Sequence, residues 1–309
     1  MTQELAFPEL GIFLNLNRVA FAIGPIKVYW YGIIVVTGIA LGFFYAYKRR
    51  EEFDVTADMI SDTALYGVIA GIIGARIYYV AFSWDFYKNH PQDIIKIWEG
   101  GIAIYGGIIG AVIMILILAR HWKINPLNIT DCCAAGLILG QAIGRWGNFM
   151  NIEAFGGNTT LPWGMTSPVI SEYLLSNMEE LAKNGIIADP MGMVHPTFLY
   201  ESIWNLLGFL FIAAYTRRRT MKGEITLLYL GVYGLGRAWI EGLRTDSLML
   251  GSFRVSQMLA ILMVLISVGL LCFLKNRQKN GKLPKCLELT PKAAQKSEEP
   301  TENPKEGKA

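Results

Sequence analysis

Seven apolar blocks, each near the ~20 residues that a helix needs to cross a bilayer, constrain this 309-residue chain more than any other feature. They cover residues 28–47, 59–81, 101–119, 130–148, 197–215, 223–242 and 254–274. Hydrophobic residues make up 53% of the chain and charged residues only 17%, whereas a soluble domain carries about a quarter charged residues. The sequence therefore predicts an all-α polytopic membrane protein with seven transmembrane helices.

Basic residues are concentrated on alternate connections between these blocks. Eighteen of the 28 Lys and Arg residues lie in 48–54 (KRREEFD), 120–125 (RHWKIN), 216–223 (TRRRTMKG) and the tail after Leu274. Cytoplasmic loops carry an excess of Lys and Arg, so this side is predicted to face the cytoplasm. Because the number of spans is odd, we expect the N-terminus outside and the C-terminus in the cytoplasm.

The longest connection, residues 149–196, lies on the opposite side and is predicted to form a small extracytoplasmic cap. Within it, SEYLLSNMEELAKNG (171–185) predicts an amphipathic helix with a capping serine, an apolar stripe and an Asn-Gly stop. The stripe comprises Leu174, Met178 and Leu181. Such a helix either packs against the bundle or guides substrate, and the sequence leaves both interpretations open.

The two ends of the chain are expected to differ from the bundle. The first 26 residues are mildly apolar, contain Pro8 and Pro25, and are expected to lie along the membrane interface. The tail over 280–309 is rich in Lys, Glu and Pro and poor in apolar residues, so it is predicted to be disordered. We therefore expect a transmembrane domain over 1–279, including the cap, followed by a disordered cytoplasmic tail.

The sequence offers no pattern for a metal, a nucleotide or a disulfide framework. Its four cysteines, at 132, 133, 272 and 286, show neither CxxC spacing nor paired placement outside the membrane. The HExxH zinc motif and the GxxxxGK[ST] phosphate loop are both absent from it. We therefore predict no cofactor, no metal site and no nucleic-acid partner.

The block at 223–242 carries ionisable side chains at helical spacing. In YGLGRAWIEGLRTD, Tyr233, Arg237, Glu241 and Arg244 follow one another at steps of four, four and three, so they share one face of a helix. An arginine at the middle of a membrane helix costs about 2.5 to 3.5 kcal/mol, and such residues usually face a cavity, a partner or a substrate. A structural ion pair between Arg237 and Glu241 would leave Arg244 and Tyr233 unexplained, so the pattern favours a functional site.

The block at 130–148 ends in a second polar motif, GRWGNFMNIEAFGG (144–157). Arg145 and Asn148 share a face, and the polar residues Asn151 and Glu153 follow just beyond, before Gly156. Irregular backbone at membrane depth occurs only where it is buried in protein or lines a cavity. The motif therefore predicts a cavity in the outer half of the membrane.

Further polar side chains approach this cavity from the same side: Tyr31, Arg76, Tyr105, His195 and Glu201. Four of them have a simpler interpretation. Tyr31 can belong to an interfacial aromatic belt, Arg76 can snorkel outward, and the glycines around Tyr105 can serve helix packing. His195, next to Pro196, can cap a helix. Together, however, several arginines flanked by carboxylates and amides match the oxygens of a phosphate, and an anionic phospholipid headgroup is the ligand available at that depth.

GRWGNFMNIEAFGG closely resembles the signature of the prolipoprotein diacylglyceryl transferases. The similarity continues in YWYG, WEGGIAIYGGIIGA, HPTFLYESIWN and YGLGRAWIEGLRTD, in this order, and covers about residues 20–275. It implies a seven-span enzyme of the bacterial plasma membrane, acting as a monomer with its active site towards the extracytoplasmic leaflet. Members transfer the diacylglyceryl group of phosphatidylglycerol to the lipobox cysteine of a prolipoprotein signal peptide, forming a thioether and releasing glycerol phosphate.

The resemblance also implies residue roles. Essential positions of the family fall on residues of the two polar motifs and of the first span: Arg145, Asn148, Glu153, Gly156, Arg237 and Tyr31, with Tyr233, Glu241 and Arg244 nearby. We expect Arg145 and Arg237 to hold the phosphate, Asn148 to orient the headgroup, and Glu153 and Glu241 to hold the arginines. Many members carry a histidine, cast as a general base, where this chain has Tyr105, so the base remains the open assignment.

Two other classes of protein also bury charges in glycine-rich helices. A secondary transporter would show paired half-repeats and a site near the midplane, and the sequence shows neither. A non-catalytic lipid-binding scaffold would use the same polar stripes for subunit contacts. A flux assay distinguishes a transporter from an enzyme, because a transporter moves solute without forming a lipidated product. A scaffold would tolerate the loss of a single arginine and keep its partners bound.

Overall fold

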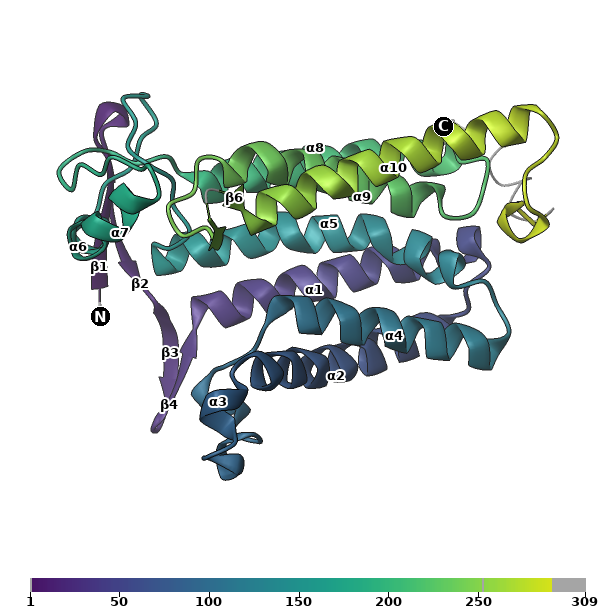
Figure 1. The fold of residues 1–309 in the computed structure, drawn as a ribbon, viewed down its shortest axis with the longest axis horizontal. Helices are drawn as coiled ribbons and strands as arrows, with labels where there is room; N and C mark the ends of the chain where they lie inside the picture. Colours follow the sequence, from purple (N-terminus) through teal and green to yellow (C-terminus); the bar gives the residue numbers. More distant parts are fainter. Residues whose placement is uncertain (1, 252, 291–309) are drawn as a thin grey trace, which may run out of the picture. The chain divides into compact units, whose positions relative to one another are not determined.

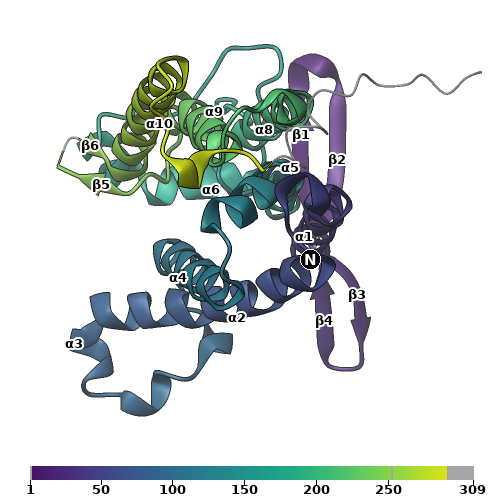
Figure 2. The ribbon, with the colours of Figure 1, turned by 90° about the vertical axis from the view of Figure 1, so that its right-hand side faces the viewer.

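The computed structural model describes residues 2–251 and 253–290. They are mostly helical (Figures 1 and 2) and fall into two compact units. The first unit comprises Met1–Phe44, Ala134–Arg219 and Glu224–Leu283, and the second comprises Tyr45–Cys133, Thr220–Gly223 and Pro284–Ala309. Each unit is described by itself below.

Six helical segments among the described residues are long and apolar enough to cross a membrane, which confirms a polytopic membrane protein. They are Trp30–Phe53, Ala57–Phe82, Ile104–Trp122, Pro126–Asn151, Thr197–Arg218 and Val255–Lys279. The predicted block at 223–242 is also helical, as α9 (Glu224–Glu241), but is not one of the six. Its 18 residues include Glu224, Arg237 and Glu241, which lower its mean hydropathy.

The first unit is built on α9, which packs against α8 (Thr197–Tyr215) on one side and α10 (Val255–Lys279) on the other (Figure 2). Small residues allow these helices to approach closely. A side chain at Gly236 would collide with the Trp204 ring of α8, and one at Gly234 with the Ala260 carbonyl of α10. Gly42 of α1 (Trp30–Arg49) similarly meets Gly136 of α5 (Pro126–Asn151) backbone to backbone.

The all-α prediction is wrong for the start of the chain. Two antiparallel hairpins precede α1: β1 (Thr2–Phe7) with β2 (Ile12–Asn17), and β3 (Val19–Ile23) with β4 (Ile26–Tyr29). The last four residues of β2, LNLN, alternate apolar and polar side chains, as strands do, and the chain turns at Gly11 and Gly24 with positive φ. A third short pair, β5 (Met249–Leu250) with β6 (Phe253–Arg254), precedes α10.

The cap helix predicted at 171–185 is instead two short helices. α6 (Pro168–Ser176) begins earlier than predicted, because Ser167 caps it by accepting a hydrogen bond from the Val169 amide at 3.3 Å. It ends at Asn177, whose side chain donates to the Tyr173 carbonyl at 2.8 Å, and α7 (Met178–Lys183) follows. Their apolar residues pack with β1 in one core, which includes Leu5, Phe155, Ile170, Leu174 and Leu181.

The second unit is built on α2 (Ala57–Phe82) and α4 (Ile104–Trp122), which lie side by side in both views (Figures 1 and 2). A side chain at Gly106 or Gly110 of α4 would collide with the backbone of α2 at Gly74 or Ala70. Tight packing, the simpler interpretation of these glycines, is thus confirmed for these two positions. The connection between α2 and α4 contains α3 (Trp84–Tyr87) and 3-10 turns at Pro91–Asp93 and Ile97–Glu99.

Disorder over residues 280–309 stays a prediction. Residues 284–290 are held to loops of the second unit by three hydrogen bonds. The Asn125 side chain donates to the Cys286 carbonyl at 2.6 Å, and the Lys222 backbone N–H donates to the Leu287 carbonyl at 2.8 Å. The Thr290 hydroxyl donates to the Asp54 carboxylate at 2.8 Å. These bonds offset part of the ordering entropy that composition alone suggested would dominate. The rest of the predicted tail, 291–309, lies outside the described residues.

Candidate active site

Glu201 of α8 lies at the centre of a cluster of three arginines in the first unit. Its Oε2 pairs with Arg145 of α5 at 2.6 Å. Its Oε1 accepts from Arg237 of α9 at 3.0 Å and from Arg244, just beyond α9, at 3.2 Å. Glu201 is almost fully buried, so three separate segments of the chain are held together through one carboxylate.

Two further carboxylates complete the arginine cluster. Arg237 also pairs with Glu241 at 2.5 Å, the ion pair that the four-residue spacing predicted. Arg244 makes a bidentate contact with Asp246 at 2.8 and 2.7 Å. Burial alone would raise the pKa of Asp246, but the hydrogen bonds and charge of Arg244 outweigh it and hold that pKa below its ordinary value. Such pairing reduces the cost of burying these charges.

Arg145 and Arg237 remain partly accessible although their partners are not. Their side chains are 21% and 17% exposed, whereas Glu201 and Glu241 are buried. Each guanidinium carries five N–H donors, more than these carboxylates use. The arginine cluster is therefore not sealed, and both arginines can present donors to an incoming anion.

A chain of hydrogen bonds connects Arg145 to the rest of its motif. Arg145 donates to the Asn148 side-chain oxygen at 3.4 Å, and Asn148 donates to Glu153 at 2.9 Å. Asn151 donates to the same Glu153 oxygen at 3.3 Å. Glu153 thus supports Arg145 through Asn148, rather than holding an arginine directly as predicted.

Gly156 joins two other predicted residues. Its amide donates to the His195 carbonyl at 2.9 Å, and it forms an isolated antiparallel bridge with Arg244. A Cβ at Gly156 would lie 2.8 Å from the His195 Cβ and 2.9 Å from the Leu243 carbonyl. The glycine is required because the His195 side chain and the Leu243 carbonyl leave no room for a further side chain.

His195 belongs to a short relay of aromatic side chains. Trp163 donates to the Tyr200 hydroxyl at 2.7 Å, and that hydroxyl lies 3.2 Å from His195 Nδ1. Burial lowers the pKa of His195, which favours the neutral ring. Donation from Tyr200 to Nδ1 uses the hydroxyl hydrogen and leaves the N–H on Nε2. In the other tautomer Nδ1 carries the hydrogen and donates to the Tyr200 hydroxyl, so the tautomer decides which ring nitrogen faces away from Tyr200 with a hydrogen.

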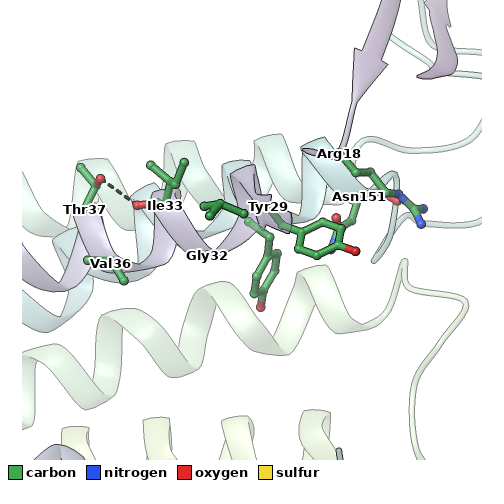
Figure 3. Close-up of a pocket in the computed structure, with 9 residues that line it drawn as sticks. Arg18, Tyr29, Gly32, Ile33, Val36, Thr37 and Asn151 are labelled. Atoms are coloured by element: carbon green, nitrogen blue, oxygen red, sulfur yellow. Dashed lines mark hydrogen bonds between the residues drawn. The ribbon is translucent and has the colours of Figure 1, made fainter. Parts of the chain in front are cut away.

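An open groove of about 760 Å³ runs along α1. It is lined by Arg18, Val28, Tyr29, Tyr31, Gly32, Ile33, Val36, Thr37 and Asn151. Figure 3 shows Arg18 and Asn151 together at one end, with Gly32 to Thr37 following along the helix. Arg18 donates to the Asn151 carbonyl at 2.5 Å, which connects the polar end of the groove to the Arg145 motif. The Tyr31 ring packs on Gly147, which belongs to the same motif as Arg145 and Asn148.

Arg76 and Tyr105 lie in the second unit, whereas the other predicted site residues lie in the first. Arg76 is 7% exposed and donates to five backbone carbonyls. These belong to Asp93, Ile94, Lys96, Gly100 and Gly101, at 2.6 to 3.4 Å. Arg76 therefore holds the connection between α2 and α4. Its contact with a headgroup and the catalytic role of Tyr105 stay predictions.

Sequence reasoning missed four polar residues of the first unit: Arg18, Gln141, Tyr229 and Asp246. Gln141 lies one turn before Arg145, and Tyr229 one turn before Tyr233. Residues at this spacing share a helix face, so the sequence pattern could have predicted both. Asp246 closes the quoted motif YGLGRAWIEGLRTD. Arg18 gave no such signal, because its site depends on the hairpin at the start of the chain.

The fold and the arginine cluster define a class: a polytopic membrane protein with a cluster of arginines and carboxylates built between its helices. A sequence profile of the prolipoprotein diacylglyceryl transferases matches residues 18–273. The chain belongs to this family. It is 43% identical over 265 residues to the phosphatidylglycerol–prolipoprotein diacylglyceryl transferase of Clostridium novyi (strain NT), covering 86% of this chain and 98% of that one.

Two further relatives carry the same name. The Staphylococcus aureus (strain Newman) protein is 44% identical over 266 residues, covering 85% of this chain and 91% of its own. The Listeria welshimeri serovar 6b protein is 44% identical over 260 residues, covering 84% and 90%. The similarity spans both helical units, so it includes every predicted site residue.

Proposed function

We propose that this chain transfers the diacylglyceryl group of phosphatidylglycerol to the lipobox cysteine of a prolipoprotein, the first step of lipoprotein maturation. The observation that carries the proposal is the arginine cluster centred on Glu201, with Arg145 and Arg237 partly exposed, in a chain of this family. The names of the relatives give the two substrates, phosphatidylglycerol and a prolipoprotein.

The reaction is a displacement at carbon. The substrate's thiol gives its proton to water, its sulfur forms a bond to the terminal carbon of the diacylglyceryl group, the bond from that carbon to the phosphate oxygen breaks, and glycerol phosphate departs with the electron pair of that bond. Negative charge grows on the departing phosphate. Arg145 and Arg237 stabilise that charge because they are already positioned and need no reorganisation in a site of low dielectric constant.

The carboxylates position the arginines rather than react. Glu201 fixes Arg145, Arg237 and Arg244 at one point, and Glu241 orients Arg237 from the same helix. The nucleophile belongs to the substrate, and nearby arginines favour the thiolate of a group whose ordinary pKa is about 8.5. A strong protein base is then not required, which is consistent with a tyrosine at position 105.

The membrane arrangement is part of the proposal. α9 is the seventh span, and its charged residues are tolerated because protein partners surround them. The N-terminus and the cap lie outside, and the basic connections lie in the cytoplasm. The chain acts as a monomer in the bacterial plasma membrane, with the site towards the extracytoplasmic leaflet.

The test is a transfer assay with purified protein, phosphatidylglycerol and a lipobox peptide. We expect a gain of one diacylglyceryl mass on the peptide and release of one glycerol phosphate per modified peptide. A matched peptide with serine in place of the cysteine gives no product. Glycerol phosphate released without any modified peptide would indicate a phospholipase of the C type, which hydrolyses the same lipid, and would refute the proposal.

A further inference from the structure

Gln141 and Tyr229 form a polar pair that the arginine cluster does not use. The Gln141 side-chain amide donates to the Tyr229 hydroxyl at 3.0 Å, joining α5 to α9. The Tyr229 ring stacks on Tyr233 with ring centres 5.9 Å apart. Gln141 lies one turn before Arg145, and Tyr233 one turn before Arg237, so polar side chains continue along both helices from the arginines to this pair.

The pair has unused hydrogen-bonding capacity. The side-chain oxygen of Gln141 is buried and has no hydrogen-bond partner within residues 2–251 and 253–290. An unsatisfied buried group of this kind costs about 1–3 kcal/mol, and native proteins contain few of them. Because the Tyr229 hydroxyl accepts from the amide, its own hydrogen remains available. The pair therefore offers one acceptor and one donor, and turning the amide over exchanges them without removing either.

A hydroxyl group is the natural complement of such a pair. It donates and accepts through the same atom, whereas ester and phosphate oxygens only accept and an ammonium group only donates. In phosphatidylglycerol the hydroxyls lie on the terminal glycerol of the headgroup. We propose that Gln141 and Tyr229 bind a hydroxyl of that glycerol and so select this lipid among phospholipids. The subsite rests on the proposed function.

The position of the pair agrees with the geometry of displacement. Gln141 precedes Arg145 by four residues, about 6 Å along the helix axis, which is within reach of a three-carbon alcohol on a phosphate held by Arg145. In a displacement at carbon, the leaving group departs opposite the incoming sulfur. A thiol that arrives at the end of α5 that carries Asn148 and Asn151 directs the glycerol phosphate towards Gln141.

The experiment compares two lipids that differ only in headgroup hydroxyls. Phosphatidylglycerol and phosphatidylpropanol, with identical acyl chains, are supplied to the full-length protein with the lipobox peptide, and kcat/KM is measured for each. We expect Gln141→Met and Tyr229→Phe each to lower kcat/KM for phosphatidylglycerol about 5- to 10-fold, the range of one neutral hydrogen bond. The kcat/KM of each variant for phosphatidylpropanol stays within about twofold of the wild-type value, because the headgroup of that lipid has no hydroxyl for the pair to bind.

Gln257→Met is the matched control. The Gln257 amide also packs on α9, where it donates to the Ala238 carbonyl at 2.8 Å, and its loss leaves the preference between the two lipids unchanged. An equal fall with both lipids in Gln141→Met and Tyr229→Phe, or no wild-type preference, overturns the subsite. Failure of the wild-type protein to use either lipid is a different result, which overturns the proposed function and the subsite with it.

Discussion

The two units each contain an arginine site, and the guanidinium groups of the two sites have different kinds of hydrogen-bond partner. Arg76 gives its N–H groups to five carbonyls of a single connection, all within 25 residues of it in sequence. Arg145 and Arg237 share a carboxylate that comes from another helix, and both remain partly exposed. Arginine in a membrane helix therefore does not by itself indicate a binding site.

The partners distinguish the two sites physically. Backbone carbonyls satisfy a guanidinium without neutralising it, and they order the loop that supplies them. Carboxylates neutralise the charge and fix its direction, which prepares the guanidinium for an anion that arrives later. A site for a phosphate needs the second arrangement, with donors left over, and Arg145 and Arg237 show it in the first unit.

The largest expected effect is the loss of turnover in Arg145→Ala or Arg237→Ala. Either substitution removes a preorganised cation from the departing phosphate, so we expect kcat to fall by at least about 100- to 1,000-fold. Glycerol phosphate release is the measurement, and membrane insertion is checked by fractionation. Arg49→Ala, which removes the ion pair to Glu52 in the second unit, serves as the matched control and keeps its activity. Normal release in both variants would show that the arginine cluster is structural.

Arg76→Met is expected to affect stability first. Five carbonyls lose a charged partner at once, so we expect a lower Tm and faster proteolysis within residues 88–100. Arg76→Lys does not restore the wild-type Tm, because one ammonium group cannot reproduce the guanidinium fork. The protein that remains folded keeps its KM for phosphatidylglycerol. A raised KM with an unchanged Tm would instead establish the headgroup contact predicted from the sequence.

A pair of neighbouring glycines tests how tightly the site is assembled. Gly156→Ala places a methyl group against His195 and Leu243, and overpacking of this kind costs about 1–3 kcal/mol. We expect about a tenfold loss of kcat/KM as the Arg244 segment is displaced. Gly157→Ala is the matched control, since a Cβ there would meet only the Leu243 carbonyl at 4.0 Å. Equal activity in the two variants would mean that the bridge between Gly156 and Arg244 does not position the site.

The sequence was informative wherever one helix decides the outcome. Apolar length placed the helices, and the four-residue spacing of Arg237 and Glu241 predicted an ion pair that the structure contains. Glu201 was named as a site residue, but its role as the common partner of three arginines depends on how separate segments pack, which spacing along one helix does not encode. The same holds for Arg18, whose neighbour Asn151 is 133 residues away.

Short elements were the least predictable part of the fold. The hairpins before α1 rest on two glycine turns and a brief alternation, a weak signal beside the apolar blocks. The cap helix divides at Asn177 because a local side-chain bond to the Tyr173 carbonyl competes with the helical pattern. In both cases a few local hydrogen bonds outweigh the average preference of the segment.

The smallest expected effect is that of His195→Gln, which distinguishes a hydrogen-bond donor from a general base at this position. Because burial lowers the pKa of His195, the folded state binds fewer protons than the unfolded state between the folded pKa and the ordinary value near 6.5. The wild-type protein therefore loses stability relative to His195→Gln as pH falls through 6.5, and the difference is constant above it. Gln retains an N–H donor, so we expect the variant to keep most of its kcat at pH 7.5. A large loss of kcat in His195→Gln, with a rate that rises with pH only in the wild type, would instead make His195 the base that accepts the thiol proton.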